Sequence, residues 1–470
     1  MKPKYLILVA GITAALSCGA FAQQDEKLGK LSFPTSCDPK VQADFERGVA
    51  MIHSYWFTYA RRTFEGVLQQ DPSCAIAYWG IALDFLGNSL ATTPTRAEAE
   101  AGWAALEKAH AVGAKTQRER DWIEALSAYY RDHDKTPVNA RLAAYNKAME
   151  DLAQRYPDDY EAQVFYALAL QASASPADTT YANQRKSAAI LEKLYDQNPQ
   201  HPGVTHFLIH AYDYHPLAQQ GIPAARRYAG IAPAVPHARH MPSHIYSMVG
   251  LWEESIASNA SAMEIQPDYY HAADFSVYAH LQLAQDAKAK ALTEKSIATA
   301  DRGDRPINFV NFTAKNAMSA RYMLERADWA GAAALPFTPT QYPQPDSLIR
   351  FTRGLGMARS GDLAGARAEI EAIKALRAAG RMDAICGQRS AAYRRPPHAG
   401  RCVRNSISVI FAIKRGSRGC GERHETACAC DGHCRRSHLS GLSTAIDRHP
   451  DGQHQRGLLP PRQRHFGDFS

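Results

Sequence analysis

Apolar residues recur every three to four positions along most of this chain, which is the spacing of helices that bury one face. We find no alternating apolar and polar pattern of the kind that predicts strands, so we expect an all-α fold. The helical spacing is clearest in residues 98–112, 118–130, 145–170, 270–300 and 348–377, and it is weaker in 314–334.

Prolines mark a longer period within this helical pattern. Pro199, Pro233 and Pro267 follow one another at a constant interval. That interval matches the length of a tetratricopeptide repeat (TPR), about 34 residues, a pair of helices that stacks on copies of itself because one pair cannot bury its apolar face alone. The sequence therefore predicts a TPR-like α-solenoid of stacked helical hairpins over residues 23–380.

Histidines gather on one face of this expected stack. If repeats begin at residues 202, 236 and 270, the second, fifth, ninth and twelfth positions of each first helix share one helix face. The candidate groove built in this way contains His206, His210, Asp213, His237, His240, His244, His271, Asp274 and Tyr278.

Three interpretations of this stripe are open. In the first, it lines a concave groove that binds a protein or peptide partner. In the second, the histidine pairs His206/His210 and His240/His244 bind a divalent transition metal such as zinc or copper. Asp274 would then be a third ligand beside a histidine pair, or would orient one of the imidazoles. A metal with an open position would activate water, as in a metal-dependent hydrolase. In the third, the histidines are hydrogen-bonded to one another and pack inside the stack without a ligand.

Pro242 lies inside the helix that carries three of these histidines, and it removes a backbone donor. We expect the helix either to begin at Pro242 or to kink there. In both cases His244 would diverge in direction from the histidines before the proline.

The N-terminus has the features of a cleaved secretory signal. Basic Lys2 and Lys4 precede an apolar stretch over residues 6–16, and Ala20-Phe21-Ala22 fits a cleavage site after Ala22. Cys18 leaves open a lipoprotein signal. No later stretch is apolar for long enough to span a membrane, so we expect a periplasmic or secreted protein.

Two cysteines belong to the repeat region. Cys37 precedes the first helix of one repeat and Cys74 the first helix of the next. Because such helix starts are neighbours in a stack, and exported proteins favour disulfides, we expect a Cys37–Cys74 bond. The alternative is two buried free thiols.

The character of the chain changes near Ala379. Residues 381–470 carry 16 Lys and Arg against 7 Asp and Glu, with six Cys and seven His, while residues 23–380 have a net charge of −4. The acidic body gives no reason to expect nucleic-acid binding. We interpret the tail as a frame-shifted reading of a longer solenoid gene, with a genuine basic appendage as the alternative.

Several sequence blocks resemble an exported bacterial TPR protein family. They include Phe45-Glu46-Arg47-Gly48-Val49, Tyr78-Trp79-Gly80-Ile81-Ala82, Ile209-His210-Ala211-Tyr212-Asp213 and the His240-Met241-Pro242-Ser243-His244 motif. The resemblance covers about residues 30–375 and ends near Ala379. It implies the fold, a binding role and these histidines as motif residues, but no assigned activity.

The frame-shift hypothesis has a direct test in the underlying DNA. Translation of the other forward frames beyond the codon for Ala379 should restore an Ala- and Leu-rich helical pattern, and the present tail should be digested rapidly by protease. A tail that resists protease, with no helical pattern in either alternative frame, would favour the genuine appendage.

Overall fold

The structure is a computed structural model that describes residues 27–300, 309–340 and 342–378. The predicted signal peptide and the tail from residue 381 onward lie outside the described residues. Within the described residues there are helices and no strands, which confirms the all-α prediction. None of the described helices is long and apolar enough to cross a membrane.

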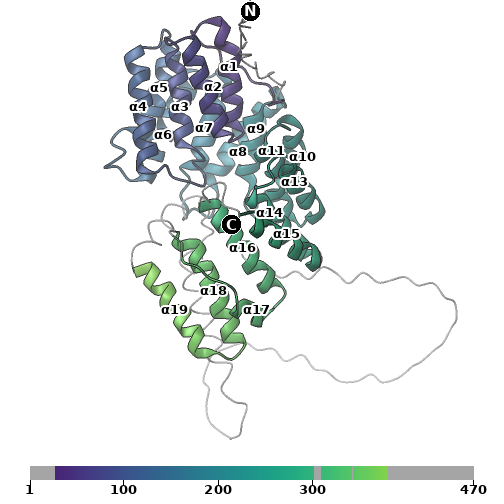
Figure 1. Cartoon of the computed structure of the whole chain (residues 1–470). Coiled ribbons are helices and arrows are strands. Elements are labelled where there is room, and N and C mark those ends of the chain that lie inside the picture. Colours follow the sequence, from purple (N-terminus) through teal and green to yellow (C-terminus); the bar gives the residue numbers. More distant parts are fainter. Residues whose placement is uncertain (1–26, 301–308, 341, 379–470) are drawn as a thin grey trace, which may run out of the picture. The chain divides into compact units, whose positions relative to one another are not determined.

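The helices follow one another along the chain with short connections (Figure 1). Two short 3-10 helices, η1 (Pro39–Val41) and η2 (Ala218–Gly221), precede α1 and α10. The α-helices are α1 (Gln42–His53), α2 (Phe57–Gln70), α3 (Ala75–Leu86), α4 (Arg96–Val112), α5 (Gln117–Tyr130), α6 (Val138–Arg155), α7 (Tyr160–Ala172), α8 (Ala182–Gln197), α9 (Pro202–Tyr212), α10 (Ile222–Ile231), α11 (Pro236–His240), α12 (Pro242–Val249), α13 (Trp252–Ile265), α14 (Tyr270–Gln282), α15 (Asp286–Ala300), α16 (Phe309–Glu325), α17 (Trp329–Ala333), α18 (Pro343–Arg359) and α19 (Leu363–Ala378).

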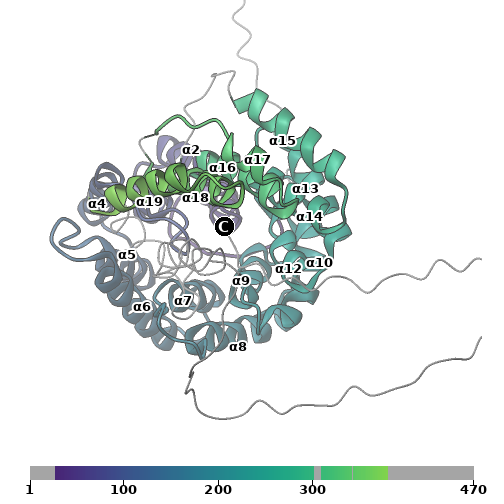
Figure 2. The same ribbon diagram turned by 90° about the horizontal axis from the view of Figure 1, so that it is seen from below.

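Successive helices pack as hairpins, and the hairpins pack on one another. Each of α1, α3, α5 and α7 packs against the helix that follows it, and the first helices also pack on each other, as α1 does on α3 and α7 on α9. The succession from α4 to α8 can be followed in Figure 2. This two-layer arrangement is a TPR-like α-solenoid.

The register predicted from the prolines is confirmed. The helices α9, α11 and α14 begin at Pro202, Pro236 and Tyr270, which are separated by the same interval as the prolines. The preceding helices α8, α10 and α13 each end two residues before the marker proline. The residue before a proline is sterically kept out of the helical conformation, so each proline fixes the end of a helix.

The helical segment that contains Pro242 is divided into two helices there, but the backbone between them stays helical. Helix α11 ends at His240 and α12 begins at Pro242, while Met241 between them keeps helical angles, with φ −52° and ψ −35°. The backbone N–H of His244 still donates to the carbonyl of Met241 at 3.1 Å. His240 at the end of α11 and His244 in α12 still meet, with their Nε2 atoms 3.0 Å apart, so the expected divergence of His244 from the histidines before Pro242 is not seen for His240.

The ring of one phenylalanine leaves no room for a side chain at two positions of the first repeats, and both positions are glycine. A Cβ atom added to Gly48 on α1 would lie 2.8 Å from the ring of Phe64, and one added to Gly80 on α3 would lie 2.6 Å from it. The fully buried Phe64 of α2 thus fills the space between α1 and α3. Small residues at both positions let the two helices close around one ring.

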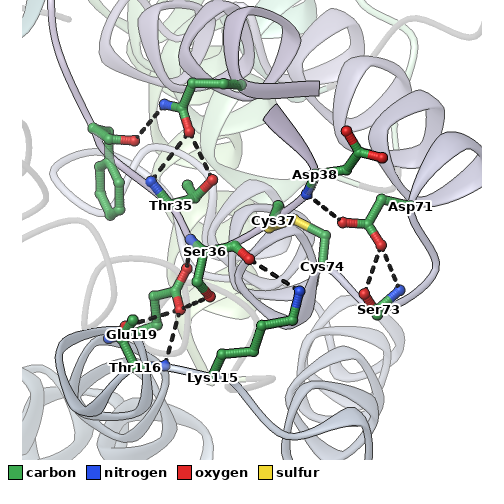
Figure 3. Close-up of a disulfide and its surroundings, with 12 residues drawn as sticks. Thr35, Ser36, Cys37, Asp38, Asp71, Ser73, Cys74, Lys115, Thr116 and Glu119 are labelled. Atoms are coloured by element: carbon green, nitrogen blue, oxygen red, sulfur yellow. Dashed lines mark hydrogen bonds between the residues drawn. A yellow bond between two sulfur atoms is a disulfide. The ribbon is translucent and has the colours of Figure 1, made fainter. Parts of the chain in front are cut away.

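The predicted disulfide between Cys37 and Cys74 is present (Figure 3). It joins the segment before α1 to the start of α3, so it links two successive hairpins. Beside it, the Asp71 side chain accepts hydrogen bonds from the backbone N–H of Asp38 at 2.8 Å and of Ser73 at 3.0 Å. These bonds anchor both cysteine-bearing segments.

We expect the Cys37–Cys74 bond to stabilise the protein by about 4 kcal/mol, because it removes loop-closure entropy from the unfolded chain. The double variant Cys37→Ser/Cys74→Ser should show this loss in urea unfolding followed by circular dichroism. Both cysteines should also resist alkylation in native, unreduced protein. Labelling of both thiols before reduction would contradict the bond.

Candidate metal site: two histidine triads

Six histidines from neighbouring repeats form two groups of three, and within each group the candidate ligand atoms lie within 4.8 Å of one another. The first triad comes from α9 and α11, and the second from α11, α12 and α14. The first triad is His206, His210 and His237, and the second is His240, His244 and His271. Each member of the second triad follows its counterpart in the first by one repeat length, so the site repeats together with the fold.

Hydrogen bonds fix the ring protons of two members of the second triad, His240 and His244. The Nδ1 atom of His244 lies 2.9 Å from a carboxylate oxygen of Asp213, which can only accept a bond. The Nδ1 atom of His240 lies 2.6 Å from Oδ1 of Asn259, whose amide nitrogen in turn donates to the carbonyl of Ser255 at 2.8 Å. Both imidazoles therefore carry their proton on Nδ1.

As a result, two unprotonated nitrogens face each other. The Nε2 atoms of His240 and His244 are 3.0 Å apart. With both Nδ1 protons committed, neither neutral ring has a proton to place between these atoms. Two lone pairs at this distance repel unless a cation lies near both of them.

The first triad offers the same type of donor. The Nδ1 atom of His206 donates to the backbone carbonyl of His53 at 2.6 Å, so its Nε2 carries a lone pair, and this atom lies 3.1 Å from Nε2 of His237. The Nε2 atom of His210 is buried and has no hydrogen-bond partner among the residues that the structure describes. His237 is oriented through its Nδ1 atom, which lies 3.1 Å from the hydroxyl of Tyr269.

Burial keeps most of these imidazoles neutral. It lowers the pKa of His206, His237 and His240 well below the ordinary value, and neighbouring imidazoles lower it further. Burial also lowers the pKa of His210 to about 3, although Asp213 acts in the opposite direction. Neutral imidazole is the form that binds metal.

Aromatic rings surround both triads. Tyr228 stacks on His206 with ring centroids 5.1 Å apart, and Tyr55 contacts the same ring edge-on at 4.5 Å. The ring centroid of Phe275 on α14 lies 4.6 Å from that of His244 and 5.1 Å from that of His240. These rings hold the imidazoles in place and make their surroundings apolar.

The repeat offset predicts two rows across the stack, one of His206, His240 and Asp274 and one of His210, His244 and Tyr278, and the structure groups these residues differently. Asp274 pairs with Arg321 of α16, at 3.0 Å, and lies outside both triads, so its expected place as a ligand is not supported. Tyr278 contacts Trp252 and Arg321 instead. Asp213 orients His244, and His237 and His271 complete the two triads. The bonds to Asn259 and Tyr269 were not found from the sequence, because neither residue belongs to the histidine stripe.

A buried carboxylate positions the helix that carries two of the three members of the first triad. Glu161 of α7 accepts one bond from Nε2 of His53 and one from Nε2 of His201, both at 2.7 Å, and all three side chains are fully buried. Nδ1 of His201 accepts the backbone N–H of Val204 and thereby caps α9. Since His206 donates to the carbonyl of His53, this network orients the triad as well.

Comparisons with known proteins add little to this geometry. No protein-family model matches the sequence, and no curated protein matches it. One similar solved structure is the crystal structure of the P58(IPK) TPR domain at 2.5 Å, with 12% identity and a TM-score of 0.21. The match covers 81% of this chain and 99% of that chain. The fold assignment therefore depends on the helix register described above.

We expect Glu161→Gln to lower the free energy of unfolding at pH 7 by about 3 kcal/mol, because the two imidazoles bond to different oxygens of Glu161 and glutamine would place an NH2 donor against one of them. Burial alone would raise the pKa of Glu161, but His201 and His53 lower it to about 2. A lowered folded-state pKa means that the stabilisation is complete above about pH 4.5 and is lost as the pH falls towards 2.

Urea unfolding at several pH values measures both effects. The exposed Glu124→Gln on α5 serves as the control, and it should change the free energy by less than about 0.5 kcal/mol. Equal unfolding free energies for wild type and Glu161→Gln at pH 7 would contradict this account of the network.

Proposed function

We propose that this protein binds transition-metal ions, one in each histidine triad. The observation that carries the proposal is the pair of Nε2 atoms of His240 and His244, which face each other at 3.0 Å while both Nδ1 protons are held elsewhere. Two imidazole nitrogens bound to one tetrahedral ion lie roughly 3.4 Å apart, so a small shift would admit a metal.

A proton is the other cation that could occupy this position. Burial disfavours a proton on His240, because it lowers the pKa of that imidazole well below the ordinary value. The Asp213–His244 pair instead matches the carboxylate–histidine arrangement that orients and strengthens metal ligands. Packing without a ligand would leave the facing lone pairs, and the buried Nε2 of His210, without compensation.

The proposal assigns binding and no reaction. Three histidine ligands leave a coordination position open, which a hydrolase would use to activate water. However, aromatic rings pack around the triads. Two surface pockets, of about 500 and 360 Å³, are lined by residues of α1 to α4 and include no triad histidine. They give no reason to place a substrate at the triads.

A protein or peptide partner is the second candidate, and the helical-repeat fold favours it. Stacked hairpins form extended surfaces whose usual role is protein binding. Such a role is compatible with metal in the triads, which would then stabilise the repeats that present the surface. We also propose export to the periplasm or beyond. The disulfide supports it, because disulfides persist in oxidising compartments.

The test of metal binding uses the full chain, purified without a histidine tag. Free thiols are first alkylated with N-ethylmaleimide, so that the cysteines of the tail do not bind metal. After loading with Zn(II) and gel filtration, elemental analysis should find about two ions per chain, one for each triad. His210→Gln and His244→Gln should each lose about one ion, and the double variant should lose both.

The exposed His215→Gln on the connection after α9 is the matched control and should retain both ions. Circular dichroism of each variant checks that helicity is unchanged. Zinc content at background in the wild type, or equal content in wild type and the double variant, would refute the proposal. Loss of a peptide partner in the double variant with metal at background would favour the second candidate.

A further inference from the structure

This inference rests on the proposed metal binding and specifies the ion. We infer that the two triads select monovalent copper, Cu(I), over divalent ions such as Zn(II). Four features of the triads favour Cu(I): the charge of the ligands, their number, the surroundings of the rings and the closeness of the two triads.

The triads supply neutral ligands, of which His206, His240 and His244 are buried and the other three are partly buried. All six candidate donors are imidazole nitrogens, and neither triad contains a carboxylate or thiolate ligand. Asp213 is an anionic side chain that contacts the second triad, through its bond to His244. A buried charge is costly unless it is compensated, and that cost grows with the square of the charge. A singly charged ion on neutral ligands therefore fits better than a doubly charged one.

The number of ligands points in the same direction. Zn(II) completes a tetrahedron and needs a fourth ligand, usually a water, when only three histidines bind it. Cu(I) is stable with three nitrogen donors and needs no fourth. Because Tyr228 and Tyr55 pack on the first triad and Phe275 on the second, a fourth, water ligand would lie in apolar surroundings.

The two triads also lie close together. His237 and His240 are three residues apart on the short helix α11, one in each triad, with ring centroids separated by 6.1 Å. Two ions held there repel each other with an energy proportional to the product of their charges. For two divalent ions that repulsion is about four times that of two monovalent ions at the same separation. Full occupancy of both triads therefore favours Cu(I).

A competition experiment tests this selectivity on the full chain with alkylated thiols. Protein loaded with Zn(II) is titrated without oxygen with Cu(I) supplied as its bicinchoninate complex. The absorbance of that complex reports copper transfer, and a zinc indicator reports release. We expect about two Cu(I) to transfer per chain with release of the zinc, and at least a hundredfold preference for Cu(I) in competition.

The variants assign the transferred copper to the triads. His210→Gln and His244→Gln should each take up about one Cu(I) fewer, and His215→Gln should match the wild type, with helicity checked by circular dichroism. Zinc that stays bound while copper remains on bicinchoninate would overturn the preference for Cu(I) and leave the proposed metal binding intact. Retention of neither metal by the wild type would overturn both. Equal copper uptake by wild type and all variants would place the copper outside the triads and overturn the inference.

Discussion

The two hydrogen bonds that the buried Glu161 carboxylate accepts from histidines are the interaction on which the orientation of the first triad depends. The carboxylate holds His53 of α1 and His201 at the start of α9 against α7, with both hydrogen bonds at 2.7 Å. Those two histidines then act through the backbone: His201 caps α9, and the carbonyl of His53 receives the ring proton of His206. A carboxylate placed among fully buried rings requires such partners. The hydrogen bonds of Glu161, His53 and His201 therefore orient the first triad, although none of these three residues belongs to it.

The repeat explains why the described residues contain two triads, and why the repeats before and after them do not form a third. Translation by one repeat length converts each member of the first triad into its counterpart in the second. One repeat earlier, the position of His237 is Gly203, where any side chain would collide with the ring of His53. One repeat later, the positions of His240 and His244 are Asp274 and Tyr278, which contact Arg321. The Glu161 network therefore takes the place of a triad in the repeat before, and the Asp274–Arg321 ion pair takes its place in the repeat after.

The fold could be predicted from the sequence further than the site could. Helical periodicity and the spacing of Pro199, Pro233 and Pro267 predicted the hairpins and the starts of α9, α11 and α14, because a local steric rule fixes where each helix ends. The histidine stripe identified the right residue type but grouped it in rows at the same repeat position. The triads are instead diagonal, since a His pair at i and i+4 meets a residue from the next repeat. Bonds to Asn259 and to the carbonyl of His53 join residues that lie far apart in sequence or belong to the backbone, so no local pattern reveals them.

Anomalous X-ray scattering from crystals of the metal-loaded full chain tests the central claim most directly. Data collected on both sides of the absorption edge of the loaded metal place each ion without reference to any assumed site. The account predicts two anomalous peaks, one among the Nε2 atoms of His240 and His244 with His271, and one among those of His206, His210 and His237. Absence of peaks at both triads, with the two Nε2 atoms of His240 and His244 still facing each other, would contradict it.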